Sequence, residues 1–325
     1  MDKKKKVVIA GAGGFIGGWL VTRLNAMGFT NIVAVDIKPL KNWYQLNNNT
    51  LNLVLDLSDP ENCREVTSQA SYVFNLAADM GGMGFIERNK ALCMLSVLIN
   101  TNLLKYSSLG TVEKYFFASS ACVYNSKLQE FSTAIPLKEE DAYPALPEDG
   151  YGWEKLFSER MCLNTSEDFG IETRIARFHN VYGPLGTFEG GREKAPAAIC
   201  RKVAEAVISN KHEIEIWGDG EQSRSFMYIE DCIDGILKIF NSSIKFPINL
   251  GSSNLVSINQ LVSIVERIAG VELERKYKLD APLGVKGRNS DNSMIKSILN
   301  WEPDISLEYG LRKTYSWIFD EMSNK

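Results

Sequence analysis

Short apolar runs alternate with longer amphipathic segments over roughly the first 180 residues of the chain. The segments of helical period predict helices near residues 15 to 28, 59 to 69, 89 to 109 and 151 to 168. Runs rich in Val, Ile and Phe lie between them and predict strands, namely VVIAGA, NIVAVDI, LNLVLDL, YVFNLAA, KYFFASS and TRIARFHN. This alternation predicts an α/β fold, a Rossmann-like doubly wound parallel sheet with helices on both faces.

The pattern changes after Tyr182, where glycine-rich and basic loops appear between helices. A chain of 325 residues also exceeds the size, about 250 to 300 residues, at which a single core stops growing. We therefore predict a second, smaller and discontinuous C-terminal lobe that binds substrate. The nucleotide domain is expected to take residues 1–178 and about 226–250, and the lobe about 179–225 and 251–325.

Composition excludes several classes of protein. With 36 basic and 40 acidic side chains, the net charge of -4 gives no reason to expect nucleic acid or an anionic membrane as a partner. The six cysteines contain no C-x-x-C pair, which predicts reduced thiols, no metal site and a cytoplasmic protein. A lysine run at residues 3–6 precedes an apolar stretch, as in a signal peptide, but no cleavage site follows.

A glycine-rich segment directly follows the first predicted strand and opens the first predicted helix. Such glycines allow a tight turn and bring backbone N–H groups close to a pyrophosphate at the helix N-terminus. Asp36 ends the next strand, where a carboxylate accepts hydrogen bonds from a ribose and repels a 2'-phosphate, so NAD is favoured over NADP. Asp56 ends the third strand and either meets the adenine or caps a helix. The predicted loop comprises Gly11, Gly13, Gly14, Phe15, Ile16 and Gly17.

Tyr151 and Lys155 lie four residues apart in a predicted helix, so their side chains share one face. A tyrosine has an ordinary pKa of about 10, and a neighbouring ammonium together with a positive nicotinamide would lower it. Ser120, after the fifth strand, could hold a substrate oxygen in line. These residues predict a hydride-transfer site, although Y-x-x-x-K alone is common by chance.

Together these motifs resemble the extended short-chain dehydrogenase/reductase superfamily over essentially the whole chain. Within it, five long strings are similar to the family of GDP-mannose 3,5-epimerases, and they are far more specific than the glycine loop. The strings are ADMGGMGFI, SSACVY, RFHNVYGPLGTFEGGREKAPAA, WGDGEQSRSF and GVKGRNSDN.

The resemblance implies a transient oxidation by NAD at C4 of a nucleotide sugar, proton exchange at C5 and C3, and reduction back at C4. It assigns Tyr151 and Lys155 to the redox step, Ser120 to orientation, and Cys122 and Lys194 to the proton transfers. A ketone at C4 acidifies the neighbouring C–H bonds, so a thiol of ordinary pKa about 8.5 is a suitable acid/base group. The alternative for Cys122 is a small buried side chain that only packs.

The expected substrate contacts come from the glycine loop before the third helix, the GREKAP segment and the basic loops of the lobe. Arg224 and Arg288 are the candidates for the diphosphate because guanidinium groups match phosphate oxygens. The resemblance also implies Ala77 at the cofactor. Helices 89 to 109 and 151 to 168 either pair across a homodimer, as in the superfamily, or bury their apolar faces inside the chain. The full substrate set is Gly81, Gly82, Met83, Ser120, Asn180, Glu193, Lys194, Ala195, Lys202, Trp217, Gly218, Gln222, Arg224 and Arg288.

Two other functions stay open at this point. A reductive enzyme similar to GDP-fucose synthase would use NADPH, which Asp36 disfavours. A nucleotide-sensing protein without turnover would not need the intact set of Ser120, Tyr151 and Lys155.

Overall fold

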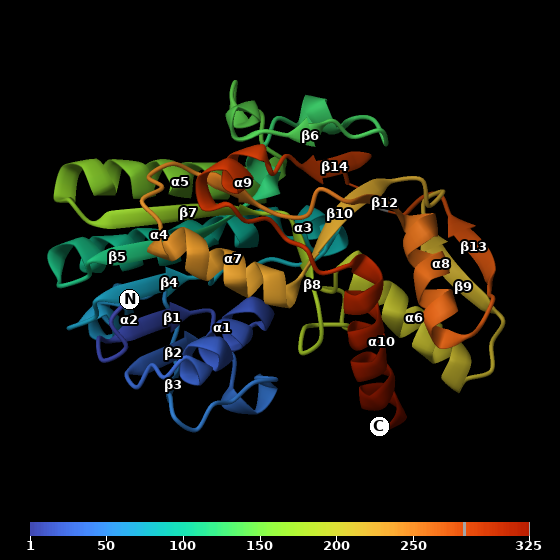
Figure 1. The fold of residues 1–325 in the computed structure, drawn as a ribbon, viewed down its shortest axis with the longest axis horizontal. Helices are drawn as coiled ribbons and strands as arrows, with labels where there is room; N and C mark the ends of the chain where they lie inside the picture. The colour runs from blue at the N-terminus through green and yellow to red at the C-terminus, as the bar shows by residue number, and fades with distance from the viewer. Residues whose placement is uncertain (282–283, 325) are drawn as a thin grey trace.

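The structure is a computed structural model that describes residues 1–281 and 284–324. A seven-stranded parallel sheet forms the larger part of the protein (Figure 1). The strand order is β11-β7-β5-β4-β1-β2-β3, so the order reverses between β1 and β4. The six predicted strands are confirmed: five of the apolar runs are mostly buried in the sheet, and the run LNLVLDL forms the less buried edge strand β3. The strands are β1 Val7–Ala10, β2 Ile32–Asp36, β3 Leu51–Val54, β4 Tyr72–Asn75, β5 Lys114–Ser120, β7 Glu172–Phe178 and β11 Ile248–Leu250.

Helices cover both faces of this sheet. On one face α2 packs against α4 and α4 against α5, and on the other α1 packs against α7. The four predicted helices are confirmed, and the fold is a Rossmann-like doubly wound sheet. The helices are α1 Phe15–Ala26, α2 Pro60–Thr67, α4 Lys90–Leu109, α5 Asp149–Phe169 and α7 Ile229–Asn241.

A second, smaller group of strands and helices lies beside the large sheet (Figure 1). Its sheet has the order β12-β10-β14-β6, with β8 paired to β10, and a two-stranded sheet joins β13 to β9. The domain division remains a proposal, with one refinement: β10, which ends at Tyr228, pairs within the second sheet, whereas β11 pairs with β7. The strands are β6 Pro136–Leu137, β8 Asn180–Tyr182, β9 Glu213–Trp217, β10 Ser223–Tyr228, β12 Leu255–Ser257, β13 Glu274–Lys278 and β14 Gly287–Ser290. The helices are α6 Ala195–Ile208, α8 Ile258–Ala269, α9 Ser293–Leu299 and α10 Leu307–Ser323.

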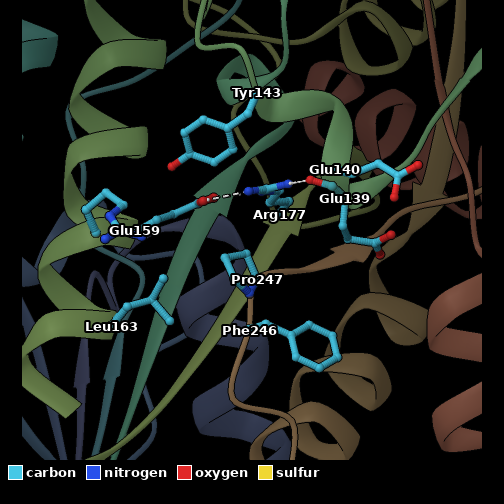
Figure 2. A pocket seen from close by; sticks show the side chains of 9 residues that line it. Glu139, Glu140, Tyr143, Glu159, Leu163, Arg177, Phe246 and Pro247 are labelled. Carbon is cyan, nitrogen blue, oxygen red and sulfur yellow. Dashed lines mark hydrogen bonds and ion pairs between the residues drawn. The ribbon is translucent and has the colours of Figure 1, made fainter. Parts of the chain in front are cut away.

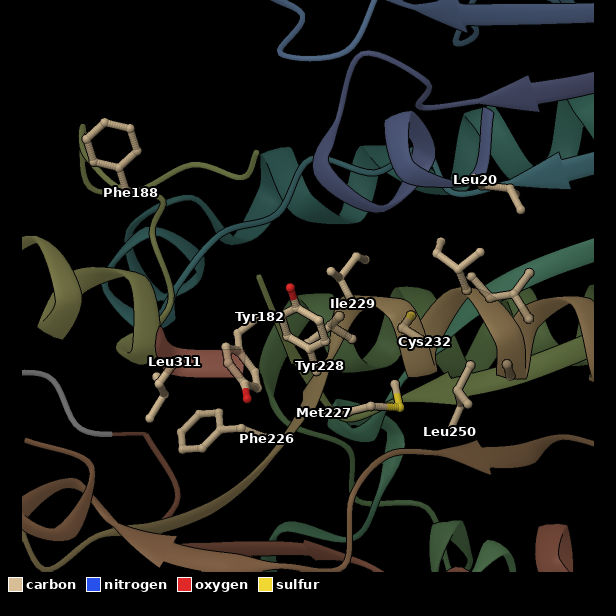
Figure 3. Close-up of a cluster of buried hydrophobic side chains, with 14 of the residues drawn as sticks. Leu20, Tyr182, Phe188, Phe226, Met227, Tyr228, Ile229, Cys232, Leu250 and Leu311 are labelled. Carbon is tan, nitrogen blue, oxygen red and sulfur yellow. The ribbon is translucent and has the colours of Figure 1, made fainter. Parts of the chain in front are cut away.

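One continuous apolar core joins the two parts. It runs from Leu20 of α1, through Tyr228 and Ile229 at the junction of β10 and α7, to Leu311 of α10 (Figure 3). These four side chains are at most 2% exposed. Because both parts pack into this one core, the core holds the ends of the loops that connect them in place.

All six cysteines are free and buried. Over residues 1–281 and 284–324, no helix has the length and apolarity needed to cross a membrane.

Candidate active site

The glycine loop lies between β1 and α1, at the point where the strand order reverses. Gly11 has φ +81°, and a side chain on Gly17 would place its Cβ 2.1 Å from the Gly11 carbonyl oxygen. Gly14 caps α1 without a side-chain hydrogen bond, and no acidic residue lies in the first turn, where Phe15 and Ile16 stand. The N-terminal N–H groups of α1 are therefore suited to a pyrophosphate, and the loop fits a dinucleotide.

The residues around this loop also fit NAD. Asp36 ends β2, is 8% exposed and accepts a hydrogen bond from the Lys38 amide at 2.9 Å through one carboxylate oxygen. Ala77 follows β4, and its amide nitrogen would lie 2.9 Å from a Cβ on Gly11, so it borders the loop. Asp56 is exposed and accepts from the Ser58 amide at 2.8 Å, so it closes the turn before α2. The helix cap belongs to Asp59, which accepts from the Glu61 amide.

The predicted reaction residues come together at the carboxyl end of β5. Ser120 is the last residue of β5, and Cys122 lies in the 3-10 helix η2, Ala121–Val123. Tyr151 stands on α5 and is 5% exposed, and its phenol lies close enough to the Ser120 side chain for Ser120 to act on the Tyr151 pKa. Gly152 allows this approach, since a Cβ there would lie 2.3 Å from the Cys122 carbonyl oxygen. The hydroxyl, thiol and phenol therefore share one closed site.

The expected lowering of the Tyr151 pKa is wrong for the chain itself. Burial raises the Tyr151 pKa well above its usual value, and the nearby Cys122 and Glu154 raise it further. Lys155 Nζ lies 5.6 Å from the Tyr151 ring centroid and 3.5 Å from Glu154 Oε2, so a carboxylate offsets its charge. A positive nicotinamide beside the phenol would act in the opposite direction, towards a lower pKa.

Lys194 reaches the same site from the second group of elements. It is the N-cap residue of α6, and Pro196 lies in the first turn of that helix. Burial lowers the Lys194 pKa, and the charge of Cys122 acts on Lys194 in the opposite sense. This influence indicates that the thiol and the amine lie near each other, the thiol on η2 and the amine at the start of α6.

The loop at residues 81–84 holds the GREK segment in place. The Gly82 amide donates to the Arg192 carbonyl at 3.1 Å, and a Cβ on Gly82 would lie 2.6 Å from the Glu193 carbonyl oxygen. Gly82 is also the N-cap of a short helix, α3 Met83–Arg88, so this segment is ordered rather than a flexible connection. Glu193 accepts a hydrogen bond from the Gly191 amide at 2.7 Å, and Ala195 follows Lys194 as the first residue of α6.

The other candidate substrate residues lie on β8, on α6, at the end of β9 and in the turn between β9 and β10. A Cβ on Gly84 would lie 3.7 Å from the Trp217 ring. Lys202 Nζ lies 5.9 Å from the centroid of the same ring and donates to the Glu215 carbonyl at 2.8 Å. Gln222 donates to the Trp217 carbonyl at 2.9 Å across the turn that contains Gly218. Asn180, on β8, donates to the Ser225 carbonyl at 3.2 Å.

Arg224 and Arg288 are cross-strand neighbours on β10 and β14. Arg288 Nη1 lies 3.6 Å from Cys122 Sγ, so this guanidinium stands at the thiol. Arg224 donates to the Ser223 carbonyl at 2.8 Å and to the Val285 carbonyl. Arg224 is therefore the better candidate for the diphosphate of the two.

Sequence reasoning missed two partners of Arg288. Gln129 accepts from Arg288 Nε at 2.6 Å, and Glu148 forms an ion pair with Nη2. No motif contains either residue. For Glu148, the available signal was an acidic side chain three positions before Tyr151.

A separate cavity of about 240 Å³ lies over the buried pair of Arg177 and Glu159 (Figure 2). Arg177 Nη2 lies 2.8 Å from Glu159 Oε2, and Nη1 donates to the Glu139 carbonyl at 2.5 Å. Glu159 also accepts from the Ser119 hydroxyl at 2.5 Å. These groups are thus already paired, and the network fixes the end of β5 next to Ser120.

Fold and site together define an enzyme of the dinucleotide-dependent type that carries acid/base groups on a closed substrate site. The chain belongs to the NAD dependent epimerase/dehydratase family, whose sequence model matches residues 7–251, and its cofactor is NAD. It is 44% identical over 328 residues to GDP-mannose 3,5-epimerase 1 of Oryza sativa subsp. indica, covering 100% of this chain and 84% of that protein. It is also 44% identical to GDP-mannose 3,5-epimerase of Arabidopsis thaliana, covering 98% and 84%. Among solved structures, UDP-glucose 4-epimerase of Thermotoga maritima with UDP-glucose superposes with a TM-score of 0.87 at 26% identity, covering 98% and 99%.

Proposed function

We propose that the protein is an NAD-dependent nucleotide-sugar epimerase that converts GDP-mannose to GDP-L-galactose by inversion at C3 and C5. The observation that carries this proposal is the electrostatic effect of Cys122 on the buried Lys194 in the site that also holds Tyr151. An enzyme that inverted only C4 would need no such acid/base pair beside the phenol. The relatives named GDP-mannose 3,5-epimerase support the choice of sugar and base.

The reaction follows from the chemistry of these side chains. Tyr151 takes the proton of the C4 hydroxyl and later returns it, while Ser120 holds the oxygen in line and Lys155 stabilises the phenolate. Bound NAD supplies the oxidation at C4 and the reduction that ends the cycle. The C4 ketone acidifies the neighbouring C–H bonds. Cys122 and Lys194 then move protons at these carbons, one group on each face of the ring.

Incubation of the protein with NAD and GDP-mannose in deuterated water tests the proposal. We expect deuterium at C5 and C3, and a product that NMR identifies as GDP-L-galactose, because each inversion replaces a carbon-bound proton with one from the acid/base groups. UDP-glucose serves as the control sugar and is expected to gain no deuterium. Net consumption of NADPH with a keto sugar would instead indicate a reductive enzyme similar to GDP-fucose synthase, and would overturn the proposal.

We also propose a homodimer formed through an exposed apolar face of α4 and α5. Leu92, Leu95 and Leu98 of α4 and Trp153 and Phe157 of α5 are between 39% and 57% exposed. Large apolar side chains that gather on two adjacent helices are typical of a protein interface. The six free thiols favour a reducing compartment, the cytoplasm, as the location.

Sedimentation equilibrium tests this interface. The parent protein is expected to give the mass of two chains, and Leu95→Glu the mass of one, because the substitution buries a charge in an apolar contact. Leu51→Glu is the matched control, since Leu51 is 58% exposed on β3, and it should remain a dimer. A parent protein that sediments as a single chain would contradict the proposal.

A further inference from the structure

An acidic side chain that the reaction above does not use lies next to the thiol. Glu148 is the N-cap residue of α5, three positions before Tyr151, and its amide donates to the Cys122 carbonyl at 2.8 Å. The backbone of Glu148 is thus fixed to η2, and its side chain extends over the same site.

Glu148 and Arg288 form a buried pair beside Cys122. Their side chains are 12% and 7% exposed, and Arg288 Nη2 pairs with Glu148 Oε2. The other carboxylate oxygen, Oε1, is buried and accepts no hydrogen bond within the described part of the chain. Arg288 Nη1 lies 3.6 Å from Cys122 Sγ. A carboxylate with one oxygen to spare therefore adjoins the thiol.

The charged and titratable groups around the thiol have opposing effects on it. Burial raises the Cys122 pKa and Glu148 raises it further, whereas Arg288 lowers it. Burial acts to raise the Glu148 pKa, but the charge and hydrogen bond of Arg288 act against it, and the Glu148 pKa lies below its usual value. The groups that face Cys122 come from α4, α5, α6, β10 and β14, and are Cys93, Glu148, Tyr151, Lys194, Arg224 and Arg288.

We propose that Glu148 is a positioning residue that holds Cys122 as a neutral thiol at rest, so that Cys122 enters the epimerisation as a proton donor. The proposal rests on the function proposed above. The carboxylate disfavours a second negative charge beside it, and this keeps the proton on the thiol. When Cys122 gives its proton to the sugar carbon, Arg288 stabilises the thiolate that is left. Lys194, whose pKa burial lowers, takes the proton removed from the opposite face.

The titration of Cys122 tests this proposal without any sugar. Iodoacetamide reacts with the thiolate, so the pH dependence of labelling reports the thiol pKa. Mass spectrometry of the Cys122 peptide separates its label from that of the other cysteines. Cys122 is also the most accessible thiol, since it is 7% exposed and the other five cysteines are 0% exposed. In Glu148→Gln the labelling midpoint is expected to fall by roughly one to two pH units, because a like charge is removed and Arg288 is freed. At neutral pH, labelling should therefore become about tenfold to a hundredfold faster.

Gln129→Leu is the matched control. It removes a hydrogen bond to the same guanidinium without a change of charge, so its midpoint should equal that of the parent within error. A Glu148→Gln midpoint that is unchanged or higher, or an equal fall in Gln129→Leu, would overturn the proposal. If Glu148→Gln does not fold, Glu148→Met replaces it in the same measurement, because methionine also removes the negative charge. A protein that fails to exchange deuterium into GDP-mannose would refute the proposed function and leave the labelling result standing.

Discussion

Replacement of Cys122 by alanine is expected to separate oxidation of the sugar from its inversion. Tyr151, Lys155 and the NAD loop are untouched, so bound NADH should still appear on mixing with GDP-mannose. Deuterium entry at C5 should fall by roughly two to four decades, the usual cost of losing a positioned acid/base group. Absorbance at the NADH band and NMR of the sugar measure the two steps on the same sample.

Cys93→Ala is the matched control for this variant. Cys93 belongs to the same apolar cluster as Cys122 and Tyr151 but is 0% exposed, so its loss should leave deuterium entry near the parental rate. Lys194→Ala is expected to show the same uncoupling as Cys122→Ala. The double variant should lose little beyond the worse single one, because both groups serve one exchange of protons. Parental epimerisation by Cys122→Ala would mean that Cys122 only packs.

The large sheet was predictable because its strands carry their own signal. Runs such as VVIA and YVFN are buried along their whole length in parallel strands, so no polar position interrupts the pattern. The glycine loop was equally readable, since Gly17 has to be a glycine to stand against the Gly11 carbonyl. Both signals are local: each depends on residues within one β-α unit.

The surroundings of the thiol were not predictable in this way. Arg288 follows Glu148 by 140 positions and Cys122 by 166, and only the pairing of β14 with β10 and β6 brings them together. The sequence places Arg288 in a basic loop, where a guanidinium can bind a phosphate or pair with another side chain. Which of these contacts forms depends on neighbours that other elements supply.

The same reason explains the error over the Tyr151 pKa. Helical spacing correctly places Lys155 on the face of Tyr151, but spacing says nothing about solvent or about further charges. The phenol is buried and Glu154 lies 3.5 Å from the ammonium, so the charged form of the tyrosine is disfavoured. The tyrosine is therefore expected to remain neutral until its cofactor is bound.

Tyr151→Phe is expected to lose most turnover while it still binds NAD. The ring remains and only one hydroxyl is removed, so the packing of α5 against η2 should survive, but the C4 hydroxyl has no group to take its proton. We expect turnover of GDP-mannose to fall by about two to four decades. Calorimetric titration with NAD should give an affinity close to that of the parent.

The outcome of this variant also decides between the two steps of the reaction. Cys122→Ala stops after oxidation, whereas Tyr151→Phe should stop before it, so neither NADH nor deuterated sugar should form. Tyr72→Phe is the control, because Tyr72 begins β4, is 7% exposed, and accepts a hydrogen bond from the Asp2 amide at 3.2 Å through its hydroxyl. Turnover of Tyr151→Phe within about threefold of the parent would refute the redox role of this residue. Loss of NAD binding together with turnover would show instead that the hydroxyl holds the cofactor.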